Sequence, residues 1–170
     1  HTWGLHKAHA AKVLGREPQT DDDRLEYLRR LGTHMGLRAY YGQPFGAGKA
    51  VASDGTEHYA GAAIEPGADL SGYALPDVKR LAERYRPVAE RSHAWGAAAE
   101  GVVTSCIHAL STALGLEGLA VACYERPEWL DEAMELVERR NRLAIAAMIE
   151  AGFDIVLFDG DCAFKQGLMI

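Results

Sequence analysis

Two carboxylates lie close together at the end of an apolar run, where they could do chemistry. Asp159, Gly160 and Asp161 directly follow Phe158, the last residue of that run. Such a pair can bind a metal, hydrogen-bond a polar substrate, or act as acid and base if burial separates the two pKa values. Alternatively, one aspartate caps the following helix and the other is solvated. Both interpretations stay open, and the position at the end of a predicted strand supports the functional one.

A second group of polar side chains lies in residues 104–108, Thr-Ser-Cys-Ile-His, at the end of another apolar run. Cys106 and His108 are spaced like alternate residues of a strand, so both could point the same way. Together with Cys162, they could form a zinc site of thiolates and imidazole. The simpler interpretation, which we favour, is that the two cysteines are small buried hydrophobic residues.

The composition is that of a soluble globular protein and excludes several classes. The 170 residues carry 18 Lys and Arg against 24 Asp and Glu, and 48% are hydrophobic. No basic run indicates a nucleic-acid partner, and no apolar stretch reaches the ~20 residues of a membrane span. Three widely spaced cysteines and the lack of a signal-peptide pattern predict reduced thiols in a cytoplasmic protein.

Short secondary-structure elements are predicted in the N-terminal third of the chain. Helices are predicted at residues 6–14 and 22–31, the second with acids in its first turn and arginines in its last. Two short strands, 49–53 and 56–63, flank Asp54-Gly55, which is typical of a tight hairpin turn.

From Pro76 onward, helices and strands alternate. Predicted helices cover residues 77–90, 108–116, 117–124 and 127–150, and apolar strands cover 95–105 and 153–158. Strand, helix and strand in this order indicate a parallel sheet of the α/β class. The carboxyl ends of parallel strands lie at one edge of the sheet, so the two polar groups should lie there together. Ligands bind at this edge in parallel α/β folds.

Motifs from about Leu70 to the end resemble the uroporphyrinogen decarboxylase superfamily in their order and spacing. This superfamily contains haem-pathway decarboxylases, methyltransferases that serve corrinoid proteins, and O-demethylating relatives. The resemblance covers about 100 residues. In chain order, the matching segments are Asp69-Leu-Ser-Gly-Tyr-Ala-Leu-Pro76-Asp77, Gly115-Leu-Glu-Gly118, Arg126-Pro-Glu128, Glu150-Ala-Gly152-Phe-Asp154-Ile, Asp159-Gly-Asp161 and Gln166-Gly-Leu-Met.

This resemblance implies an α/β fold that is part of a (β/α)8 barrel, with the active site at its C-terminal mouth. We expect one domain over residues 1–170, with N-terminal helices and a small antiparallel hairpin insertion in 1–65 and βα units in 70–170. A barrel typically needs about 250 residues. The chain lacks an initial Met and stops on the apolar run Gly167-Leu-Met-Ile170, so we expect an incomplete barrel and a longer intact protein.

The resemblance implies an enzyme of corrinoid-linked methyl transfer, because the Asp159-Gly-Asp161 turn is more similar to the methyltransferase branch and two positions depart from the decarboxylases. Leu114 stands where the decarboxylases carry Tyr, and Gly160 stands where they carry Ser. In many methyltransferase members, zinc bound by His and Cys of the later half activates a thiol. The predicted site residues are Asp159 and Asp161 as catalytic groups, and His108, Gly160 and Gln166 as substrate contacts.

Two other functions stay open at this point. One is a true uroporphyrinogen decarboxylase that removes acetate carboxylates without a cofactor, and the other is a non-catalytic relative that only binds a ligand. The substrate is expected to be a small molecule or a corrinoid protein. The oligomeric state is open, a homo-oligomer included.

Overall fold

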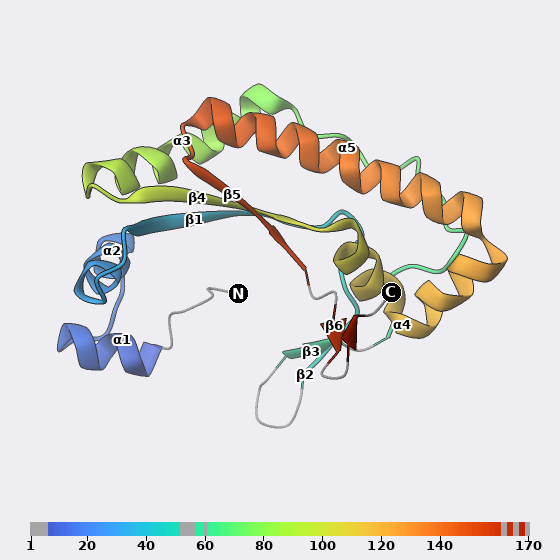
Figure 1. The fold of residues 1–170 in the computed structure, drawn as a ribbon, viewed down its shortest axis with the longest axis horizontal. Helices are drawn as coiled ribbons and strands as arrows, with labels where there is room; N and C mark the ends of the chain where they lie inside the picture. Colours follow the sequence, from blue (N-terminus) through green and yellow to red (C-terminus); the bar gives the residue numbers. More distant parts are fainter. Residues whose placement is uncertain (1–6, 52–56, 60, 161–162, 165–166, 169–170) are drawn as a thin grey trace.

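Three parallel strands form the sheet that organises the molecule. The computed structural model describes residues 7–51, 57–59, 61–160, 163–164 and 167–168. The strands are β1 (Met35–Tyr41), β4 (Ala98–Thr104) and β5 (Ile155–Asp159), in the order β1-β4-β5. All three therefore have their carboxyl ends at one edge of the sheet, which lies beside helix α4 in Figure 1.

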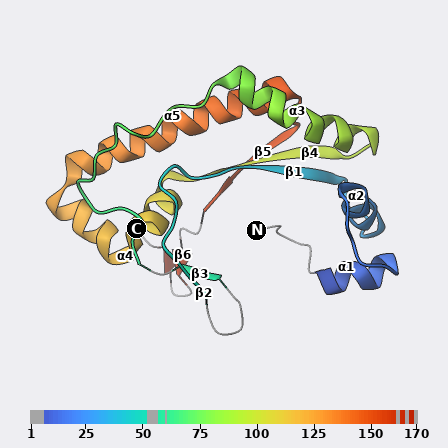
Figure 2. The same ribbon diagram turned by 180° about the vertical axis from the view of Figure 1, so that it is seen from behind.

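Helices cover one face of this sheet and both of its ends. Helices α3 (Val78–Ala94) and α5 (Pro127–Ala151) lie side by side across one face, as Figures 1 and 2 show from opposite sides. Helix α4 (Cys106–Glu125) begins at the carboxyl end of β4. Helices α1 (Lys7–Leu14) and α2 (Asp21–Arg30) lie at the opposite end, near the start of β1.

Local sequence signals explain where these helices begin and end. Thr20 and Asp23 form a reciprocal capping box that starts α2. The side chain of Asp77 accepts the backbone N–H of Arg80 and so caps α3. Helix α5 starts at Pro127 and stops at Gly152, whose positive φ of 91° is a conformation that glycine tolerates.

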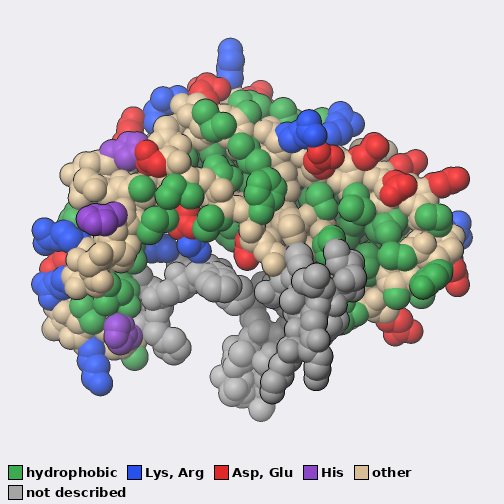
Figure 3. Space-filling model, in the orientation of Figure 1, with side chains coloured by type: hydrophobic (Ala, Val, Ile, Leu, Met, Phe, Trp, Pro, Cys, Tyr) green, Lys and Arg blue, Asp and Glu red, His purple; other side chains and the backbone are tan. Residues whose placement is uncertain are grey.

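The main core lies between the sheet and helices α3 and α5, and small residues let these layers approach closely. Alternate residues of β1 and β4 face the helices, where alanines and Met148 cover them. A Cβ atom on Gly101 would lie 2.4 Å from the buried Met148 Sδ, so a larger residue there would force the Met148 side chain to shift. Figure 3 shows charged side chains along the outer surface of α3 and α5.

A second core lies between α4 and the first half of α5. Its buried residues are Phe45, Ala109, Leu110, Ala113, Leu114, Ala122, Ala133 and Val137. Helix α4 is broken at Gly115 (φ 73°, ψ 167°), which divides it into the two helical segments that the sequence predicts. Among the described residues, α4 is the one helix long and apolar enough to cross a membrane, a test that core helices of soluble proteins also meet.

The expected (β/α)8 barrel is wrong for the residues that the structure describes. Closing a barrel requires every strand to pair on both sides. Here only β4 has two neighbours, and β1 and β5 form the two edges of an open three-stranded sheet. Two helices, α4 and α5, connect β4 to β5, where a barrel unit has one.

The shorter strands stand apart from this sheet. β2 (Lys49–Val51) and β3 (Glu57–Tyr59) pair antiparallel, and the Asp54-Gly55 turn between them lies outside the described residues. β6 (Ala163–Phe164) and β7 (Gly167–Leu168) form a second antiparallel pair. Neither pair adds a strand to the parallel sheet.

Candidate functional site at the carboxyl edge of the sheet

The ends of the two strands that carry the predicted polar groups lie together in the structure. Thr104, the last residue of β4, is in register with Asp159, the last residue of β5. The backbone N–H of Ser105 donates to the carbonyl oxygen of Asp159 over 2.8 Å. The prediction that both strand ends meet at one edge of a parallel sheet is thus confirmed.

Three strands each contribute one polar side chain to this edge. The hydroxyl of Tyr40, on β1, donates to Asp159 Oδ2 over 2.9 Å and lies 3.3 Å from Thr104 Oγ1. Thr104 is buried, whereas Tyr40 is 45% exposed. A phenol, a hydroxyl and a carboxylate therefore form one hydrogen-bonded group, which we call the edge triad (Tyr40, Thr104 and Asp159).

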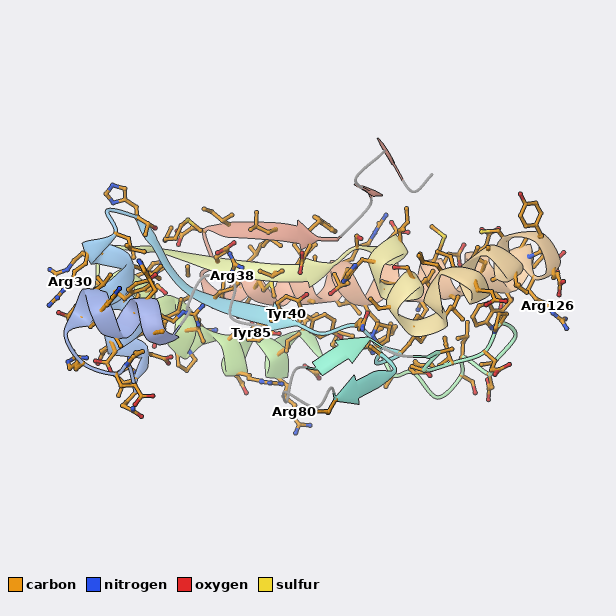
Figure 4. The ribbon with its side chains drawn as sticks, turned by 90° about the horizontal axis from the view of Figure 1, so that it is seen from below. Arg30, Arg38, Tyr40, Arg80, Tyr85 and Arg126 are labelled. Atoms are coloured by element: carbon orange, nitrogen blue, oxygen red, sulfur yellow. The ribbon has the colours of Figure 1, made fainter. Side chains whose placement is uncertain are left out.

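Helix α3 fixes the backbone that carries Tyr40. The Tyr85 hydroxyl donates to the carbonyl oxygen of Tyr40 over 3.3 Å. Burial raises the pKa of Tyr85, which keeps this hydroxyl protonated and able to donate. Figure 4 shows Tyr40 and Arg38 along β1, with Tyr85 beside them.

Gly160, the residue that follows β5, lies against the start of α4. Ser105 caps this helix by accepting the backbone N–H of His108 over 3.3 Å. A Cβ atom on Gly160 would lie 2.2 Å from Ser105 Oγ and 3.3 Å from His108 Cβ. Any larger residue would displace the capping serine, so this glycine is required by close packing between the two strand ends.

A groove extends from His108 along α4. Its volume is about 900 Å³, within the range of small-molecule sites. The loop around Ile64 forms one wall and the broken part of α4 forms the other. Its lining residues are Gly61, Ala62, Ile64, Glu65, Pro66, His108, Ser111, Thr112, Leu114, Gly115, Leu116, Glu117, Gly118 and Val121.

The predicted common direction of Cys106 and His108 is wrong. Both residues lie in the first turn of α4, not on a strand, so positions two apart point about 200° apart around the helix. The Cys106 thiol lies 3.8 Å from the carbonyl oxygen of Met134, and burial raises its pKa. A thiol in this environment is a poor source of the thiolate that a metal site needs.

The described residues also offer no zinc site. They contain no group of three or more His, Cys, Asp or Glu side chains that could hold a metal ion. Cys162, Asp161 and Gln166 lie outside the described residues. The catalytic role of Asp161 and the substrate contact of Gln166 therefore stay predictions.

Two polar side chains on the face of the sheet opposite α3 and α5 were not predicted as site residues. Arg38 and Glu100, on neighbouring strands, form an ion pair beneath the edge triad. In the sequence, the indication of this ion pair is Glu100, which is the single charged residue in the otherwise apolar predicted strand 95–105. A buried carboxylate requires a partner, but the partner is 62 residues away in the chain and cannot be identified from local pattern.

Comparison of the chain with protein-family models, with curated proteins and with solved structures finds no match.

Proposed function

We propose that this protein is an enzyme that binds a small substrate at the carboxyl edge of its sheet, with Asp159 as the reacting carboxylate. The observation that carries the proposal is the hydrogen bonding of this side chain. Its Oδ2 accepts the Tyr40 hydroxyl, and its Oδ1 has no partner among the described residues. One oxygen thus holds the carboxylate in place, and the other is left to accept a hydrogen bond from a ligand.

The surroundings of Asp159 support a site for a ligand with a polar group and a less polar body. Thr104 and Tyr40 supply further hydroxyls beside the carboxylate. His108, packed against Gly160, links this edge to the groove along α4. A polar group could therefore be held at the strand ends while the remainder of the ligand occupies the groove.

The reaction that we propose is corrinoid-linked methyl transfer, on the resemblance to the uroporphyrinogen decarboxylase superfamily. The substrates are then a methylated corrinoid and a thiol. The carbon–sulfur bond forms as the cobalt–carbon bond breaks, its electron pair stays on cobalt, and the thiol proton passes to Asp159. The described residues contain no group that fits a zinc site, so the proposed reaction uses no step on that metal.

The contacts of Arg38 and Arg140 do not favour tetrapyrrole decarboxylation at Asp159. That reaction requires arginines that bind the substrate's carboxylates. Arg38 is paired with Glu100. Arg140 donates to the carbonyl oxygen of Ala74 and lies over the ring of Tyr41. Neither guanidinium is directed at Asp159 by these contacts.

Mixing the protein with methylcobalamin and 2-mercaptoethanol tests the proposal directly. Loss of the methyl group changes the corrinoid absorbance, which gives the rate. Asp159→Asn should lower this rate by about 100-fold, because a positioned acid or base typically contributes 10²–10⁴-fold. Asp131→Asn, on the exposed surface of α5, is the matched control and should leave it unchanged.

Two results would contradict the proposal in different ways. No demethylation by the wild-type protein would exclude this corrinoid and thiol as its substrates. Demethylation that Asp159→Asn leaves intact would show that Asp159 is not the reacting carboxylate.

A further inference from the structure

A second guanidinium faces the Arg38–Glu100 ion pair from helix α2. Arg38 binds both carboxylate oxygens of Glu100 through Nε and Nη2, over 2.7 to 2.9 Å. Glu100 is only 3% exposed. Its charge is thus already paired with Arg38, and Arg24 on the neighbouring helix adds a second positive charge.

The side chain of Arg24 has no hydrogen-bond or ion-pair partner among the residues that the structure describes. Its Nε atom is buried and unsatisfied. Burial lowers the pKa of Arg24, and Arg38 lowers it further by repulsion, whereas Asp21 and Glu100 favour the charge. Arg140, whose Nε is also buried, differs because it donates to the carbonyl oxygen of Ala74.

A cavity of about 230 Å³ lies between these groups. Its lining residues are Arg24, Leu28, Thr33, Met35, Gly36, Arg38 and Glu100. Two guanidiniums against one carboxylate leave a net charge of +1 among these lining residues. The Nη1 atom of Arg38 is not used in the pair with Glu100 and has no other partner among the described residues.

We propose that this cavity binds a small oxyanion, a phosphate or carboxylate group, between Arg24 and Arg38. Nε and an Nη of Arg24 offer parallel donors that fit two oxygens of such a group. Arg38 Nη1 can donate to the same anion while Arg38 keeps its pair with Glu100. An anion would then balance the excess charge and satisfy the buried Nε. The cavity lies toward the amino ends of the strands, so it is separate from the edge triad.

Titration with inorganic phosphate, followed by two-dimensional NMR, tests this site. Sodium chloride keeps the ionic strength constant, so screening of surface charge does not change. The wild-type protein should show saturable shifts at the amides of Arg24, Met35 and Arg38. Arg24→Met should weaken phosphate binding at least tenfold, whereas Arg80→Met, an exposed arginine of α3, should leave it unchanged (Figure 4). Acetate in a parallel titration distinguishes a carboxylate preference from a phosphate preference.

Thermal unfolding in an anion-poor buffer distinguishes a binding role from a structural one. If Arg24 serves a ligand, Arg24→Met removes a half-buried, unpartnered charge and should unfold at the same temperature as wild type or higher. If Arg24 only stabilises the fold, the variant unfolds at a lower temperature, and the proposal is overturned. Unsaturable shifts, or equal phosphate binding by wild type and Arg24→Met, would also overturn it.

Discussion

The carboxylates at the two ends of the sheet differ in how fully they are hydrogen-bonded. Toward the amino ends, both oxygens of Glu100 are bound by Arg38. Asp154, which precedes β5, accepts a backbone N–H and lies 2.8 Å from His93 Nε2. At the carboxyl edge, Asp159 has one hydroxyl partner among the described residues.

This difference separates structural acids from one that is available to a ligand. A carboxylate whose partners belong to the protein gains little from a ligand and loses stability when it is removed. A carboxylate with a spare oxygen contributes little to the fold and can interact with a substrate. Substitutions of Glu100, Asp154 and Asp159 are therefore expected to differ in their effects on stability and on activity.

The largest expected effect is that of Glu100→Gln. The substitution leaves two guanidiniums around an uncharged amide and should lower the free energy of unfolding by about 3 kcal/mol, the low end for a broken buried pair. Urea denaturation measures it. Arg38→Met combined with Glu100→Met should recover most of the loss, because no charge of the pair is then left unbalanced. A free energy of unfolding for Glu100→Gln within about 0.5 kcal/mol of wild type would contradict the structural role of Glu100.

A smaller, pH-dependent effect is expected for Asp154. The hydrogen bond with His93, and then the Ala99 N–H, hold the pKa of this carboxyl below its usual value of 3.8. A depressed folded-state pKa contributes stability that is complete above the unfolded value and is lost as the pH falls through the folded value. Thermal unfolding should therefore show Asp154→Asn less stable than wild type at pH 7, with the gap narrowing below about pH 4. A gap independent of pH would be inconsistent with this assignment.

The smallest effect on stability is expected for Asp159→Asn. This side chain loses at most one partly exposed hydrogen bond, so the free energy of unfolding should change by less than about 0.5 kcal/mol. The same urea titration used for Glu100 measures it. A loss comparable with that of Glu100→Gln would mean that Asp159 is a structural acid, and the contrast between the two ends would fail.

The helices and two of the three sheet strands could be predicted because their signals are local. Pro127 and Gly152 mark the ends of α5, and the apolar runs before residues 104 and 159 mark β4 and β5. Strand β1 was not predicted. Its register shifts between Met35 and Arg38, which interrupts the alternation that identifies a half-buried strand.

The position of the candidate site could be predicted, but most of its contacts could not. Placing Asp159 and Thr104 at one edge required only the rule that parallel strands end together. The Tyr40–Asp159 hydrogen bond joins residues 119 positions apart, so no local pattern contains it. The Cys106 prediction failed because the cap at Ser105 starts α4 at Cys106, two residues before the predicted helix start at residue 108. Cys106 and His108 therefore lie on a helix and not on a strand.

The order of strands in the sheet has a consequence for folding kinetics. Met35 pairs with Ala98 and Glu100 pairs with Ile155, so each ladder joins segments more than 50 residues apart. Such non-local pairing requires long loops to close, and the chain loses this conformational entropy before the stabilising contacts form. Folding is therefore slower than in helical proteins. Helices α4 and α5, which are adjacent in sequence and pack together, can form first. During refolding, the three strands of the sheet would then pair last. The yield should fall as the protein concentration rises, because unpaired apolar strands aggregate.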